Sequence, residues 1–162
     1  MMAEIAAGPP QQGYLMPDLT GSFTEYLEGL HKEAAGEDLP PERVRQTTWW
    51  ARDDHGNLLG EIRLRHELTQ FLLVEGGNIG YVVRPSARRN GVATRMLKLA
   101  LEEAARFGLD RVLLVCDDDN EASRRTIEKN GGILDPNPIV EGQTWLRYWI
   151  ELPKVAATLG TD

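Results

Sequence analysis

The chain has 162 residues, 41% of them hydrophobic and 27% charged, which is the composition of an ordinary globular domain. Its formal net charge of -7 argues against nucleic acid or an anionic membrane as the main partner. No apolar stretch approaches the length of a membrane span, and residues 1–13 lack the regions of a signal peptide, so we expect a cytoplasmic protein. The single cysteine fits a reducing compartment and excludes a framework of intrachain disulfides.

The first quarter of the chain predicts one helix. Residues 1–12 are rich in Ala, Gly, Pro and Gln and are expected to be loose, and residues 13–18 are expected to form a short strand. Ser22 and Glu25 have the spacing of a capping box. Apolar residues then recur at helical spacing at Phe23, Tyr26, Leu27 and Leu30. This pattern predicts an amphipathic helix that ends at the break over residues 36–41.

Three antiparallel strands are predicted next. Residues 47–52 and 58–66 are joined by a credible hairpin turn at 54–57. In the second strand apolar and charged residues alternate, so one face is expected to be buried and the other polar. The third strand, 79–83, follows two consecutive glycines.

A turn suited to an anion follows the third strand. Residues 77–94, GNIGYVVRPSARRNGVAT, read as a strand, a turn and the start of a helix. The first amides of a helix have no intrahelical partners and lie at the positive end of the helix dipole. Gly91 has no Cβ, so a phosphate can approach the backbone there. Between Glu75 and Glu102 the chain has no acidic residue but five basic ones, Arg84, Arg88, Arg89, Arg95 and Lys98. This local positive field predicts an anionic ligand, most simply a phosphorylated small molecule.

The second half alternates helices and strands. In order, the predicted elements are a helix at 92–107, a strand at 112–116, a helix from 120 to 129, and an antiparallel pair at 132–140 and 144–152. The strand at 112–116 is continuously apolar, as expected for a strand that is buried on both faces and parallel to the third strand. We expect a single domain over residues 13–152, followed by a tail at 153–162.

The pattern Arg88-x-x-Gly91-x-Ala93 resembles the R/Q-x-x-G-x-G/A signature of the GNAT superfamily, the acyl-CoA-dependent N-acetyltransferases. A strand precedes it, and a helix, a second apolar strand and a helix start at Asn120 follow it, as the family requires. The resemblance spans roughly residues 45–152 and implies an α/β (α+β) GNAT fold. That fold has a mixed central sheet of about six or seven strands, flanked by about four helices, with splayed parallel strands expected at 78–84 and 111–116. The run from Arg65 to Gly91 also resembles a group of bacterial predicted acetyltransferases of unknown acceptor.

The resemblance implies that acetyl-CoA is the co-substrate. Its pantetheine arm would lie between the two splayed strands and bond to the backbone of Tyr81, Val82 and Val83, where an amide would polarise the thioester carbonyl. The pyrophosphate would lie on the amides of Arg88, Arg89, Asn90, Gly91, Val92, Ala93 and Thr94. Asn120 would bond the arm. The plainer interpretations are a simple turn with solvated arginines, and a helix cap at Asn120.

The chain departs from the family pattern at the catalytic acid. Asn120, Ser123 and Ile127 are spaced to share one helix face. The position of Ile127 is usually a tyrosine that protonates the departing thiolate, and an isoleucine cannot donate a proton. Ser123 or an ordered water could substitute for it. A thiol with a pKa of about 8 to 9 can also leave as a thiolate with little help.

The general base has three candidates. A primary amine with a pKa near 10 must lose a proton before it attacks a carbonyl. Glu75, His66 and Glu67 could accept that proton, directly or through water. In some family members a glutamate matches Gly77, so that role is vacant here. The plainer interpretations are a solvated charge at Glu75, a satisfied buried histidine at His66, and a surface charge at Glu67.

Metal and covalent chemistry are not expected. His66-Glu67 begins like a zinc-protease motif, but the second histidine is missing. Cys116 lies in the apolar strand and is interpreted as a packing residue instead of an acyl carrier.

The sequence therefore predicts an N-acetyltransferase that moves the acetyl group of acetyl-CoA to an amine of a small molecule, by direct attack in a ternary complex. Neither nucleic acid nor a membrane is expected as a partner, and a homodimer is left open. Two alternatives remain. One is a non-catalytic acyl-CoA sensor, motivated by Ile127, and the other is an acetyltransferase of protein lysines or N-termini.

Overall fold

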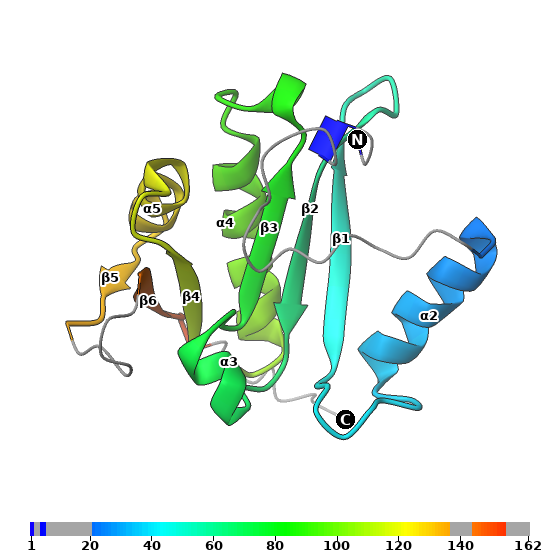
Figure 1. The fold of residues 1–162 in the computed structure, drawn as a ribbon, viewed down its shortest axis with the longest axis horizontal. Coiled ribbons are helices and arrows are strands. Elements are labelled where there is room, and N and C mark those ends of the chain that lie inside the picture. Colours follow the sequence, from blue (N-terminus) through cyan, green and yellow to red (C-terminus); the bar gives the residue numbers. More distant parts are fainter. Residues whose placement is uncertain (2–3, 6–20, 137–143, 155–162) are drawn as a thin grey trace, which may run out of the picture.

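The computed structural model describes residues 1, 4–5, 21–136 and 144–154, which form two three-stranded antiparallel sheets with helices packed against them (Figure 1). The first sheet has the order β1-β2-β3, with strands Gln46–Arg52, Leu58–Arg65 and Ile79–Val83. The second has the order β4-β6-β5, with strands Arg111–Asp117, Trp145–Glu151 and Ile133–Leu134. The expected α/β class is confirmed, although these strands form two sheets instead of one continuous sheet. The strand expected at 13–18 and residues 137–143 of the final pair lie outside the described residues.

The first long helix, α2 (Phe23–Ala35), begins at the predicted capping box. Ser22 Oγ accepts a hydrogen bond from the Glu25 amide at 3.2 Å, and the Ser22 amide donates to Glu25 Oε2 at 2.7 Å. Two of the four orphan amide groups are thereby satisfied. Gly36 ends the helix at φ 81°, a left-handed conformation that glycine adopts without a steric penalty.

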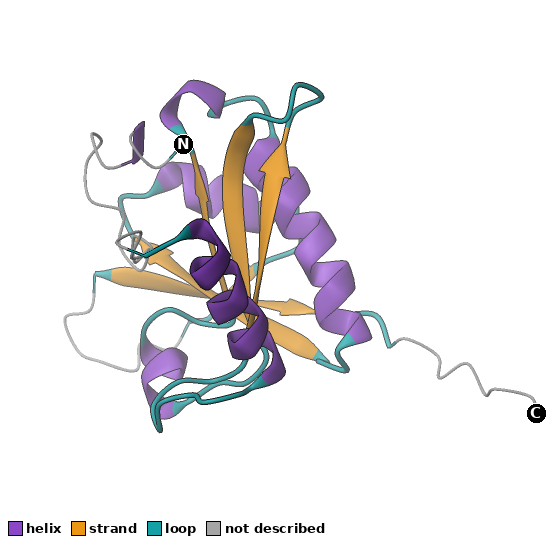
Figure 2. Cartoon of the chain, turned by 90° about the vertical axis from the view of Figure 1, so that its right-hand side faces the viewer, coloured by secondary structure: helices purple, strands orange, loops and turns teal. Residues whose placement is uncertain are grey.

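Helices lie on both sides of the first sheet (Figure 2). The rings of Tyr26 and Trp50 are 6.2 Å apart, so α2 packs on the face of β1 that carries Trp50. On the other face Ile62 and Leu64 of β2 are buried in one cluster with Met96 and other residues of α4 (Val92–Arg106). The sequence pattern predicts that the charged face of β2 is exposed to solvent. Because α2 covers this face, it is partly buried instead.

The segment between β2 and β3 contains a short helix that the sequence did not predict. Thr69 caps α3 (Gln70–Val74), and its hydroxyl accepts from the Leu72 amide at 3.2 Å. Leu72 is buried. The threonine cap and this apolar contact explain why five residues with few helix signals form a turn of helix.

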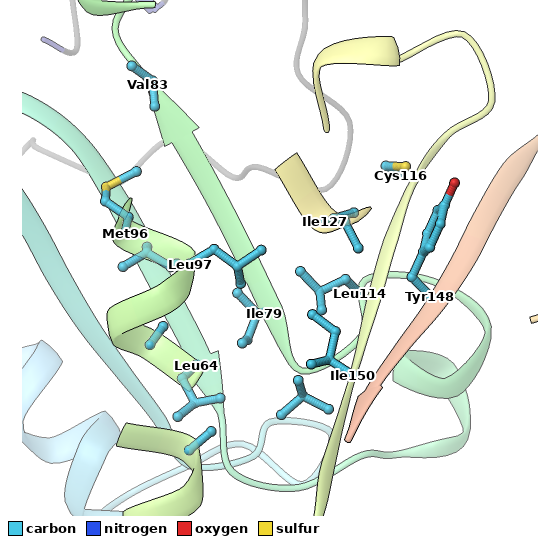
Figure 3. Packing of buried hydrophobic residues seen from close by; sticks show 14 of the residues in the cluster. Leu64, Ile79, Val83, Met96, Leu97, Leu114, Cys116, Ile127, Tyr148 and Ile150 are labelled. Carbon is cyan, nitrogen blue, oxygen red and sulfur yellow. The ribbon is translucent and has the colours of Figure 1, made fainter. Parts of the chain in front are cut away.

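The core is built around α4 and the two sheets. Along α4, the apolar stripe buries Met96, Leu97, Ala100, Ala104 and Ala105. From the second sheet come Val112 and Leu114 of β4 and Ile150 of β6, and the last helix, α5 (Glu121–Lys129), adds Ile127. Figure 3 shows Leu97 of α4, Leu114 of β4 and Ile127 of α5 directed into the space between β3 and β4. None of the helices in the described ranges is long and apolar enough to span a bilayer.

Asn78 joins the two sheets. Its amide donates to the Leu113 carbonyl at 2.7 Å, and its Oδ1 accepts from the Leu113 amide at 2.8 Å. Its Nδ2 donates to the Arg65 carbonyl at 3.1 Å, so one buried side chain connects β2 to β4. Beyond this point β3 and β4 run in the same direction and diverge, as Val83 and Cys116 show at their far ends (Figure 3). The splayed parallel pair expected from the resemblance is therefore present.

Part of the N-terminal segment contacts the turn after β3. Glu4 Oε2 accepts from the Ser86 hydroxyl at 2.7 Å and from the Ser86 amide at 3.2 Å, and these bonds lower the pKa of Glu4. Ile5 is buried. Ser86 belongs to a single 3-10 turn, Pro85–Ala87, which leads into the arginine-rich loop.

Candidate active site

The N-terminus of α4 is open. Gly91 is the N-cap at φ 74°, and no side chain of the described residues caps the helix. The amides of Val92, Ala93 and Thr94 therefore lack both intrahelical and side-chain cap partners. A Cβ built on Gly91 would meet no atom of the described residues within 4 Å, so among them glycine is required by its φ and not by crowding. The first turn of α4 therefore presents amide donors and the positive end of the helix dipole, which suit an anion.

The preceding loop is held in place by its own side chains. Arg88 Nε donates to the Val83 carbonyl at 3.1 Å, which ties the loop to the end of β3. Asn90 Nδ2 donates to the Ala87 carbonyl at 3.4 Å. Arg89 adopts φ 64°, so left-handed residues stand at both Arg89 and Gly91. Together with the exposed Arg95, these residues give the loop its positive charge.

The edge of β3 that faces β4 is open beyond Asn78. Hydrogen bonds from the Arg84 amide to Leu59 and from the Arg65 amide to Asn78 fix the alternation of the β2–β3 ladder. By that alternation the backbone groups of Val82 point to β2, whereas those of Tyr81 and Val83 point toward β4. The Val83 carbonyl already accepts from Arg88. The amides of Tyr81 and Val83 are therefore both donors of β3 that are directed toward the gap.

The start of α5 lies across this gap. Asn120 Oδ1 accepts from the Ser123 amide at 3.1 Å, so Asn120 is an N-cap. Ser123 Oγ lies 3.1 Å from the hydroxyl of Tyr81, and Ile127 is 1% exposed within the gap (Figure 3). The structure thus brings the predicted residues Tyr81 and Ser123 together across two elements.

Gly77 has no room for the side chain that some family members carry there. A Cβ on Gly77 would lie 2.4 Å from the Leu113 carbonyl oxygen, and Gly77 adopts φ 63°. Arg65 Nη1 donates to the carbonyls of Gly76 and Gly77 at 3.3 and 3.1 Å, which fixes this turn. Glu75 stands just before the turn with an exposed side chain. A glutamate cannot occupy position 77 here, because the backbone of β4 lies too close.

His66 lies at the other end of α4. Its Nε2 is 2.8 Å from Thr47 Oγ1, and its ring stacks on Phe107 at a centroid distance of 4.4 Å. Phe107 is the C-cap of α4, about 24 Å from Gly91 along the helix axis. Burial, together with the nearby Arg45, lowers the pKa of His66. The histidine is packed and hydrogen-bonded, and the structure does not bring it to Tyr81 and Ser123.

Glu67 is a surface charge. Its carboxylate pairs with Arg45 at 3.1 Å, and both side chains are at least half exposed. Among the residues that the structure describes, no group of three or more His, Cys, Asp or Glu side chains could hold a metal ion.

Two residues of structural weight were missed by sequence reasoning. One is Asn78, which carried no signal beyond its place after two glycines. The other is Glu61, whose carboxylate is fully buried and accepts from Trp50 Nε1 at 2.8 Å and Arg63 Nε at 2.7 Å. In the sequence Glu61 alternates with apolar residues, which predicts that it lies on a solvent-exposed face of β2. In the structure α2 covers that face.

Comparison with known proteins agrees with this architecture. A family model described as an acetyltransferase (GNAT) domain matches residues 19–133. No curated protein matches the sequence. The GNAT domain of S. lividans PAT has a TM-score of 0.56 at 14% identity, over 67% of this chain and 62% of that one. This chain thus spans less than two thirds of the S. lividans chain.

Two further structures are similar. Mycobacterium smegmatis RimJ in complex with CoA-disulfide has a TM-score of 0.59 at 21% identity, over 87% of this chain and 64% of that chain. Spermidine N-acetyltransferase from Vibrio cholerae, in complex with CoA and spermine, has a TM-score of 0.56 at 17% identity, over 86% and 80%. At these identities the similarity shows the fold. The family model covers well over half of the chain, and the chain therefore belongs to the family of GNAT acetyltransferase domains.

Proposed function

We propose that this chain is an N-acetyltransferase that transfers the acetyl group of acetyl-CoA to a primary amine of a small molecule. The observation that carries the proposal is the open N-terminus of α4 beside a gap between β3 and β4. Gly91 leaves three amides without a cap, and Arg88 and Arg89 flank them. Such a helix start is suited to the diphosphate of CoA, because amide donors and the helix dipole both favour an anion.

The gap beyond Asn78 would take the pantetheine arm. The Tyr81 amide points into it from β3, and the buried side chains of Val83, Cys116 and Ile127 give it an apolar lining. An amide directed at a thioester carbonyl stabilises the negative charge that develops on its oxygen. Thr94, in the first turn of α4, would add a hydroxyl to the diphosphate site. Asn120 keeps its role as the cap of α5.

Proton removal from the amine falls to Glu75 in this proposal. It is exposed and lies just before the turn where the two sheets meet. The other two candidates are engaged elsewhere, His66 with Thr47 and Phe107, and Glu67 with Arg45. Glu75 would act through water, and the deprotonated amine would attack the thioester directly in a ternary complex.

The proposal is tested by CoA release from acetyl-CoA over a panel of amines that includes polyamines, amino acids and short peptides. Polyamines belong in the panel because a structural neighbour was solved with spermine. We expect turnover with at least one small amine and a lower rate for Glu75→Gln. Turnover on peptides alone would favour an acetyltransferase of protein amines and would contradict the small-molecule assignment.

A sensor of acyl-CoA is the second candidate, and Ile127 is the observation that favours it. This side chain is buried at 1% exposure in the gap and cannot donate a proton. Tight binding of CoA without CoA release on any amine in the panel would support the sensor.

A further inference from the structure

The side chain of Tyr81 crosses from one strand of the gap to the helix on its other side. It leaves β3, and its hydroxyl lies 3.1 Å from Ser123 Oγ and 3.4 Å from the Ser123 carbonyl oxygen. Thr126 and Cys116 are near enough to influence its ionisation. The phenol of Tyr81 therefore lies close to groups from β4 and α5. The backbone amide of the same residue points into the gap.

The apolar side chains and the cysteine beside the gap offer little to a leaving thiolate. Val83 and Ile127 carry no donor, and Cys116 has only a weak S–H donor. Burial raises the pKa of the Cys116 thiol to about 11, so it stays uncharged and apolar in character. The Tyr81 hydroxyl is thus a hydrogen-bond donor at a site where Ile127 has none.

We propose that the Tyr81 hydroxyl donates a hydrogen bond to the sulfur of the departing CoA thiolate, in place of the missing helical acid. In this arrangement the Ser123 hydroxyl donates to the Tyr81 oxygen, and the single phenol proton turns from the Ser123 carbonyl oxygen to the sulfur. The inference rests on the proposed function, since it assigns a role within the same site.

The chemistry requires a hydrogen bond and not a complete proton transfer. Burial raises the pKa of Tyr81 to about 12, so the phenol stays protonated. A thiol with a pKa of about 8.5 is the stronger acid and keeps its negative charge beside this phenol. As the amine nitrogen bonds to the carbonyl carbon, the carbon–sulfur bond breaks and its electron pair passes to sulfur. The amine's proton goes to Glu75 or water, and the thiolate takes a proton from water after it leaves.

The test compares Tyr81→Phe with Tyr148→Phe. Tyr148 is a matched control because its hydroxyl also bonds side chains of α5, among them Glu128 at 3.2 Å, but from β6. We expect Tyr81→Phe to lower kcat about 10- to 100-fold, the scale of one hydrogen bond to a charged group, with the Kd for CoA unchanged. The control should leave kcat unchanged.

A second readout separates catalysis from structure. In the binary complex, the pKa of the CoA thiol can be followed by the ultraviolet absorbance of the thiolate. A hydrogen bond from Tyr81 lowers this pKa below that of free CoA, and Tyr81→Phe should raise it by about one unit. This measurement on the unmodified protein remains decisive if Tyr81→Phe does not fold: a pKa below that of free CoA supports the inference, and an equal or higher pKa overturns it.

The outcomes distinguish the two proposals. Binding and turnover of acetyl-CoA with an unchanged kcat and thiol pKa in Tyr81→Phe would overturn the role of Tyr81 and leave the proposed function standing. An equal loss of activity in both variants would also overturn it, since that would show a structural effect. No binding of CoA at all would remove the proposed function and this inference together.

Discussion

Replacing Asn78 with alanine is expected to lower the free energy of unfolding by about 2 to 6 kcal/mol, because two buried backbone groups each lose their partner at about 1 to 3 kcal/mol. The groups are the Leu113 amide, now 2.8 Å from Asn78 Oδ1, and the Arg65 carbonyl, 3.1 Å from Nδ2. Asn78 itself is 1% exposed, so water cannot replace these bonds without opening the join between the sheets. Urea denaturation followed by circular dichroism measures the change.

The control for this prediction is Asn57→Ala. Asn57 Nδ2 also makes a side-chain hydrogen bond, to Asp53 at 2.9 Å, but in an exposed turn. Water can take over an exposed bond, so the loss should be much smaller than at Asn78. Equal effects of the two substitutions would show that Asn78 is not what holds β3 against β4.

Replacing Gly91 with valine is expected to raise the Kd for CoA roughly 100-fold, an effect on the scale of one hydrogen bond to a charged group lost. Two causes act together. A branched side chain is strained at φ 74°, which distorts the first turn of α4. A Cβ at this open position would also stand in the space through which an anion approaches. Isothermal titration calorimetry with CoA measures the affinity.

Gly108 provides the matched control at the other end of the same helix. It adopts φ 82°, and a Cβ there would also meet no atom within 4 Å. Gly108→Val should therefore destabilise the fold by a similar amount, about 1 to 2 kcal/mol, without weakening CoA. Equal losses of affinity in the two variants would mean that Gly91 acts through stability alone and not through the ligand.

Much of the fold follows from local patterns in the sequence. The capping box at Ser22 and the apolar stripe of α4 fix helices that the structure shows within a few residues of their predicted bounds. The continuous apolar run in β4 correctly indicates a strand buried on both faces. These features need no knowledge of distant neighbours, because each depends on periodicity or on a cap within one element.

The parts that were not predicted depend on contacts between distant residues. The bond between Asn78 and Leu113 joins positions 35 apart, and the burial of Glu61 depends on a helix more than 25 residues earlier. The two-sheet arrangement also depends on distant residues, since β3 and β4 belong to different sheets and Asn78, just before β3, bonds to Leu113 of β4. No short pattern encodes such contacts.

Some features of the candidate site also follow from local sequence patterns, and others depend on contacts between distant residues. The turn at Gly91, where we propose that an anion binds, could be predicted from its glycine, its arginines and its place between a strand and a helix. The meeting of Tyr81 with Ser123 was not, because it depends on how α5 lies across the gap. His66 was a candidate on residue type alone, and the structure shows it packed on Phe107 at the far end of α4.

The central claim is that the first amides of α4 hold the diphosphate of CoA, and amide NMR tests it most directly. In a titration of the 15N-labelled protein with CoA, the signals of Val92, Ala93 and Thr94 should shift progressively and saturate. Pantetheine, which lacks the diphosphate, should leave them nearly unchanged. If these three amides stay fixed while CoA binds and shifts signals elsewhere, the diphosphate lies at another site and the account is wrong.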